Sequence, residues 1–165
     1  GIREIVARLV GSEMCIRDRV YSSLKFITSL NRSNRFIARG SVGSTSTKDF
    51  NKLPPSVRFF TGGSQTVRGY DYRSLGPEDD SGDVIGARRL LTGSLEFEHS
   101  LNDRWAVAVF YDAGNAIDDF DDDLERGAGF GVRWNSPVGP VRIDLANAIS
   151  DDESWQLHLN IGPDL

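Results

Sequence analysis

Apolar and polar side chains alternate along most of this chain, and this period of two constrains the fold more than any other feature of the sequence. The clearest case runs from Trp105 to Asp112, where every odd-numbered position is Trp, Val or Tyr. Because a strand turns successive side chains to opposite faces, the pattern indicates strands with two different sides. It predicts about seven antiparallel strands, near residues 20–30, 35–45, 94–98, 105–114, 127–135, 141–145 and 155–161.

One side of these predicted strands is apolar, and the other carries Glu, Asp, Arg, His, Asn and Gly. A soluble β-sandwich and a membrane β-barrel both produce such alternation, because each has one apolar and one polar side. The placement of the aromatic residues favours the barrel, since interfacial girdles fall at strand ends. The residues predicted to form them are Trp105, Tyr111, Trp134 and Trp155. A soluble all-β fold with these aromatic side chains in its core is the alternative.

The connections between the predicted strands alternate in length. Three are short and polar (SLNRSN, SLNDR and NSPVGP), whereas 46–90, 115–126 and 149–154 are generally longer and more acidic. Outer-membrane barrels show this asymmetry, with the long loops outside, and they need an even number of at least about eight strands. We therefore expect an all-β fold that is the C-terminal part of a transmembrane β-barrel, with missing strands before Val20.

Composition excludes several classes of function. The 24 acidic and 19 basic residues give a net charge of −5, so no nucleic-acid partner is expected. Cys15 is the single cysteine, which excludes an internal disulfide, and the distant His99 and His158 do not predict a metal site. No nucleophile elbow or supported acid–base pair is present, so we expect neither catalysis nor a cofactor.

Residues 1–19 differ from the rest of the chain. They contain its only methionine and its only cysteine, in the run GSEMCIRDR, which resembles translated sequencing-adapter read-through. We therefore expect 1–19 to be a non-native leader and assign no function before Val20. The alternative is a short amphipathic helix from Ile2 to Val10.

The predicted connection 46–90 is too long for a hairpin, and a loop of this size usually has a function. It contains the run LPPSVRFFTGGSQTVRGYDYRSLGP, in which VRGY occupies 67–70. Four further phrases follow in order: SLEFE at 94–98, FYDAGNA at 110–116, GFGVRWNSPVGPVRIDLA at 129–146 and LHLNIG at 157–162. Together they resemble the inward-folded loop and the last strands of the outer-membrane barrel assembly and secretion superfamily, over nearly all of 20–165.

The phrases PPSVRFF, GGSQTVRGY and RWNSPVGPVRIDLA and the ending GPDL favour the TamA branch of that superfamily, the outer-membrane subunit of the translocation and assembly module. The resemblance implies a protein of the Gram-negative outer membrane that is not an enzyme and helps insert or translocate autotransporters and other barrel proteins. It implies a TamB-like inner-membrane partner, client proteins and outer-membrane lipid. Within the superfamily, a two-partner secretion transporter and a BamA-like general barrel-assembly protein are the alternatives. Outside it, the alternatives are a porin, a barrel fused to a lipase and a soluble β-domain.

The resemblance also implies a role for the tip of the long loop. In the family, positions matching Glu96 and Asp112 receive the loop arginine, and both lie on the inward side of neighbouring predicted strands. A guanidinium inside a barrel needs counter-charges, and its planar fork suits carboxylates. We expect Arg68 to clamp the loop to the inner wall through these two residues. Gly69 should permit a tight turn, with Tyr70 packed beside it. A solvated Arg68 is the alternative.

The last predicted strand is expected to border a gate. In the superfamily a weak seam lies between the first and last strands, where a client strand can pair with an exposed edge. Gly162 and Pro163 should end the pairing early, because proline has no N–H and glycine holds a strand poorly. The residues assigned to this gate strand are Trp155, Leu157, Leu159, Ile161 and Gly162.

Overall fold

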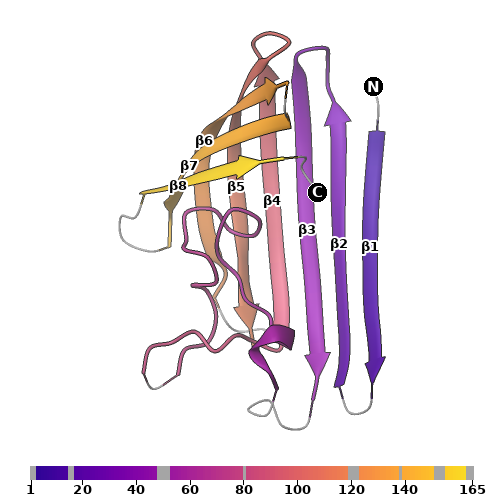
Figure 1. The fold of residues 1–165 in the computed structure, drawn as a ribbon, viewed down its shortest axis with the longest axis vertical. Coiled ribbons are helices and arrows are strands. Elements are labelled where there is room, and N and C mark those ends of the chain that lie inside the picture. The colour runs from indigo at the N-terminus through magenta and orange to yellow at the C-terminus, as the bar shows by residue number, and fades with distance from the viewer. Residues whose placement is uncertain are drawn as a thin grey trace.

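The fold is taken from a computed structural model, which describes residues 3–14, 17–47, 53–79, 81–118, 123–137, 139–150 and 155–162. Within these residues, eight antiparallel strands form one sheet in chain order (Figure 1). They are β1 (Arg3–Met14), β2 (Arg17–Ser29), β3 (Asn34–Ser46), β4 (Arg89–Ser100), β5 (Trp105–Ile117), β6 (Glu125–Ser136), β7 (Gly139–Ala148) and β8 (Trp155–Ile161). No helix in the described part of the chain is long and apolar enough to cross a membrane.

The seven strands β2 to β8 confirm the predicted all-β fold, and β1 adds a strand before Val20. The alternative of a helix from Ile2 to Val10 is wrong, because the described residues from Arg3 onward are extended and pair with β2 from Arg3↔Thr28 to Met14↔Arg17. Pairing of this kind uses backbone groups that every non-proline residue has. It therefore does not test whether 1–19 is foreign to the protein, which stays a prediction.

The two sides of the sheet carry the side chains that the alternation predicts. On β5, Val107 and Val109 are exposed on one side, while Phe110 and Asp112 are buried on the other. Large apolar side chains are exposed on the outer side of β2 to β8, including Phe130 (54%) and Leu157 (70%). These residues do not form a closed protein core, so the soluble alternative is wrong. A continuous apolar surface of this kind suits contact with lipid.

The aromatic residues follow the girdle prediction in part. Trp105 and Trp134 are register partners at the short-turn ends of β5 and β6, with stacked rings whose centroids lie 5.7 Å apart. Trp155 begins β8. Tyr111 was wrongly placed at a strand end, since β5 continues to Ile117 and leaves it mid-strand. The error arose because pairing with β4 extends through Ala116 and Ile117, beyond the clear alternation.

The connection between β3 and β4 folds back over the inner side of the sheet, where β6, β7 and β8 curl round toward it (Figure 1). It contains the short 3-10 helix η2 (Pro55–Val57) and isolated bridges such as Phe59↔Ala87 and Thr61↔Leu75. Its buried apolar residues include Leu53, Phe59, Val67, Tyr70 and Leu75. The connection is therefore an inward-folded loop, as the family resemblance implied, and it has a packed interior.

Candidate functional site: a buried arginine on the inner wall

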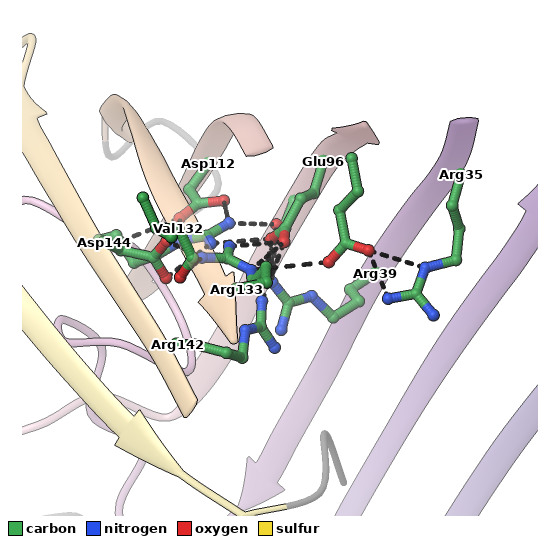
Figure 2. Close-up of polar contacts among 11 residues, drawn as sticks. Arg35, Arg39, Glu96, Asp112, Val132, Arg133, Arg142 and Asp144 are labelled. Carbon is green, nitrogen blue, oxygen red and sulfur yellow. Dashed lines mark hydrogen bonds and ion pairs between the residues drawn. The ribbon is translucent and has the colours of Figure 1, made fainter. Parts of the chain in front are cut away.

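Four neighbouring strands direct charged side chains to the same place on the inner wall. Glu96 on β4, Asp112 on β5, Arg133 on β6 and Asp144 on β7 are all buried, because each occupies an inward position of its strand. Figure 2 shows these side chains converging with those of Arg142 and of β3. The alternation of the strands thus assembles a polar cluster inside the barrel wall.

Arg68, at the tip of the folded-in loop, lies within this cluster, and its side chain is 1% exposed. Its Nε and Nη2 donate to Asp112 Oδ2 and Oδ1 at 2.6 and 2.8 Å, which is the bidentate arrangement that suits a guanidinium. Its Nη1 donates to Glu96 Oε2 at 2.8 Å and lies 3.5 Å from Asp144 Oδ2. The structure thus brings Arg68, Glu96 and Asp112 together, and it adds Asp144, which the sequence analysis did not single out.

Further arginines share the same carboxylates. Glu96 Oε1 accepts from Arg133 Nη2 at 2.7 Å and from Arg142 Nη2 at 3.0 Å, and Arg133 also pairs with Asp144. On β3, Arg39 Nη2 donates to Glu96 Oε2 at 3.3 Å. These contacts link five strands to the loop through shared charges, an arrangement that is costly to break one partner at a time.

The charge of Arg68 is secure in this setting. Burial on its own lowers the pKa of Arg68, but the hydrogen bond and charge of Asp112, followed by those of Glu96, raise it above the ordinary value. The guanidinium also lies over the ring of Phe110, with Cζ 3.5 Å from the ring centroid. Arg68 is therefore a permanent cation held between carboxylates and an aromatic face.

Glycines on β6 leave the space in which the loop tip rests. A Cβ at Gly127 would lie 1.9 Å from the carbonyl oxygen of Arg68. A Cβ at Gly129 would lie 2.6 Å from Cζ of Phe110, the residue beneath the guanidinium. The loop tip thus approaches β6 more closely than any side chain at Gly127 would permit.

The two residues after Arg68 also contact the wall. Gly69 has φ +101°, and a Cβ there would lie 2.9 Å from the backbone nitrogen of Ala148. Tyr70 is buried with Val67, Leu75 and Ala148, and its hydroxyl donates to Glu125 Oε2 at 2.9 Å. Burial and this hydrogen bond raise the pKa of Tyr70, so the hydroxyl keeps its proton as a donor.

Tyr70→Phe is expected to loosen the loop without releasing it, because the ring stays packed and only the polar contacts of its hydroxyl are lost, which include the hydrogen bonds to Glu125 Oε2 and to the backbone oxygen of Arg126. The expected cost is about 1 kcal/mol. It should appear as a modest rise in the rate of protease cleavage within 47–88. Tyr72→Phe is the matched control, since Tyr72 is 78% exposed. Equal cleavage rates for the two variants would contradict the assigned contact.

The residues assigned to the gate strand occupy the outer side of β8. Trp155, Leu157, Leu159 and Ile161 are 60–75% exposed, and β8 ends at Ile161, before Gly162. Gly162 N–H still donates to Pro140 O at 2.9 Å, so pairing stops one residue later than the strand itself. Pro163 lies outside the described residues.

The fold and the site together define a segment of a transmembrane β-barrel whose long loop is anchored inside by a buried arginine. The chain belongs to the Omp85 superfamily, since the profile of the Omp85 superfamily domain matches residues 9–164. That match begins within 1–19 and does not decide the origin of this segment. Fold and membership agree with the expected localisation, the outer membrane of a Gram-negative bacterium.

Two curated relatives and one solved structure illustrate the similarity. The chain is 31% identical over 114 residues to "Outer membrane protein assembly factor BamA" of Nitratidesulfovibrio vulgaris, covering 64% of this chain and 14% of that protein. It is 27% identical over 123 residues to "Outer envelope protein 80, chloroplastic" of Arabidopsis thaliana, covering 67% and 15%. Its fold resembles the crystal structure of BamA from Haemophilus ducreyi lacking POTRA domains 1-3, with a TM-score of 0.79, 19% identity and coverage of 95% of this chain and 37% of that chain. The chain thus spans about a seventh of the length of these curated relatives.

Proposed function

We propose that this chain is the last part of the barrel of an outer-membrane protein assembly factor, which helps barrel proteins enter the membrane and has no enzymatic activity. The observation that carries the proposal is the loop tip held inside the wall by Arg68, Glu96 and Asp112. A porin needs no loop arginine bound to its wall. Membership of the Omp85 superfamily and the similarity to a protein named as an assembly factor support the same proposal.

Within this function we favour the TamA branch, which would make autotransporters the main clients and a TamB-like inner-membrane protein the partner. The loop and β6–β7 phrases of this sequence support that choice. A BamA-like general assembly protein is the second candidate, because a relative with 31% identity carries that name. A two-partner secretion transporter is the third, and it would export one dedicated partner.

Reconstitution of the full-length protein tests these candidates. Liposomes of outer-membrane lipid, with and without the protein, receive an unfolded porin-type barrel or an unfolded autotransporter barrel, and insertion is followed by protease protection of the client. We expect faster insertion with the protein present. Stimulation of the autotransporter alone supports the TamA branch, and equal stimulation of both clients supports the BamA-like candidate.

Two further outcomes complete the design. Arg73→Ala, which changes an exposed arginine of the same loop, should retain the stimulation that Arg68→Ala loses. No stimulation of either client by the unaltered protein would contradict an assembly function. Passage of a secreted partner into the liposomes, without insertion of barrels, would identify the two-partner secretion transporter.

A further inference from the structure

The folded-in loop contacts every inward-facing side chain of β8, the strand at the edge of the sheet. Gln156 Nε2 donates to Asp71 Oδ1 at 3.0 Å, and Gly69 N–H donates to His158 Nε2 at 3.1 Å. Ser64 Oγ donates to Asn160 Oδ1 at 3.3 Å. Because 156, 158 and 160 alternate with the apolar outer residues, these three contacts form a ladder along the inner side of the strand.

The sheet itself holds β8 less firmly than its other strands. The pairing of β7 with β8 covers seven positions, whereas each of the other neighbouring pairs covers ten to twelve. In the described sheet β8 has a neighbour on one side only. Its outer side chains are 60–75% exposed, so they add little packing against other residues of the described sheet. The ladder to the loop is thus a large part of what fixes the position of β8.

The ladder and the arginine site belong to the same short stretch of chain. Gly69, which donates to His158, directly follows Arg68, which is bound to β4 and β5. The backbone N–H of Arg68 also donates to Asp112 Oδ2 at 3.1 Å, so a movement of the loop tip away from Asp112 also takes the Gly69 N–H away from His158. One peptide bond, between Arg68 and Gly69, thus connects the ion pairs with β4, β5 and β7 to the hydrogen bond with β8.

We propose that residues 64–71 of the loop fasten the inner side of β8 to the rest of the wall, so that β8 loosens when Arg68 leaves its carboxylates. Gln156, His158 and Asn160 are positioning residues in this arrangement. They bind the loop from the inner side of β8, opposite the exposed gate residues. The inference concerns the pairing of β8 and holds whatever the function. Joined to the proposed function, it gives the loop control over when the last strand can pair with a client.

Amide hydrogen exchange on the full-length protein in nanodiscs tests the proposal, with mass-spectrometric readout of peptides from 155–161 and from β4 and β5. The first variant is the triple substitution Gln156→Ala, His158→Leu and Asn160→Leu. We expect exchange in 155–161 to become at least about tenfold faster, because three hydrogen bonds are lost, while β4 and β5 keep their rates. Arg68→Ala should also speed exchange in 155–161, and Arg73→Ala should not.

A conservative variant separates positioning from general destabilisation. His158→Gln keeps a side-chain acceptor for the Gly69 N–H and should exchange at nearly the original rate, whereas His158→Leu alone should not. Unchanged exchange in 155–161 for the triple variant would overturn the proposal, as would an equal increase in β4 and β5. Since no client is present, this result is independent of the reconstitution assay and of the proposed function.

Discussion

Arg68→Ala is expected to release the loop from the inner wall and to remove most of the assembly activity of the protein. Asp112 loses both guanidinium hydrogen bonds, and Glu96 and Asp144 lose a cation, while all three carboxylates stay within the wall. Removing one partner from a buried ion pair costs about 3–5 kcal/mol, because the remaining charge is left uncompensated. The tip is then held by the hydrogen bonds of Gly69 and Tyr70 and by the buried side chains around Tyr70, and we expect these contacts to be too weak to keep the loop in its site.

Limited proteolysis of the full-length protein in its membrane provides the measurement. Cleavage within 47–88 should become fast in Arg68→Ala and stay slow in Arg73→Ala. Arg68→Lys should fall between the original protein and Arg68→Ala, because an ammonium keeps the charge but cannot bind Asp112 through two parallel hydrogen bonds. If Arg68→Ala left both protease resistance and client insertion unchanged, the loop clamp would be wrong.

Gly127→Ala is also expected to release the loop, because it changes the strand, β6, that the loop tip contacts. The new methyl group would meet the carbonyl oxygen of Arg68 at 1.9 Å, far inside van der Waals contact, and neither backbone has a flexible end that can yield. Overpacking of this type costs about 1–3 kcal/mol, which the loop avoids by moving away from β6. We therefore expect faster cleavage of 47–88 and reduced client insertion.

Gly93→Ala is the matched control, since a Cβ there would have its nearest contact at 3.9 Å, the carbonyl oxygen of Ala113. Both substitutions replace a strand glycine by alanine, so differences between them report on the contact with the loop. The double variant Arg68→Ala and Gly127→Ala adds a second check. Its effect should be little larger than that of Arg68→Ala alone, because a loop already released no longer meets the methyl group. Full additivity would contradict the shared contact.

The alternation of side chains was enough to predict β2 to β8 and their two sides, but not β1. Val107 and Phe130 face outward and Phe110 and Asp112 face inward. A period of two leaves only two assignments, and the placement of aromatic residues favoured the barrel, in which the apolar side faces out. Family resemblance supplied the rest of the prediction, which paired Arg68 with Glu96 and Asp112. The alternation alone predicts which strand residues face the inside of the barrel. It does not predict which loop residue binds them.

Three parts of the site were missed for physical reasons. Asp144 has the inward parity that would have marked it as a third carboxylate, but only the curl of the sheet shows that β7 approaches Arg68. His158 accepts a hydrogen bond from the backbone N–H of Gly69. Every non-proline residue has this group, so the sequence of the loop does not show that the contact forms. The role of Gly127 depends on a close approach between segments far apart in the chain, which local glycine patterns cannot show.

The position of the loop in the chain has a consequence for biogenesis. Arg68 is made before β4, yet its carboxylate partners on β5 and β7 lie 44 and 76 residues further along, and the contact of Gly69 lies on β8. The closing of such long stretches of chain is slow compared with the pairing of adjacent strands. We therefore expect the arginine to enter its site late in maturation, after a stage in which the charged loop tip is still hydrated.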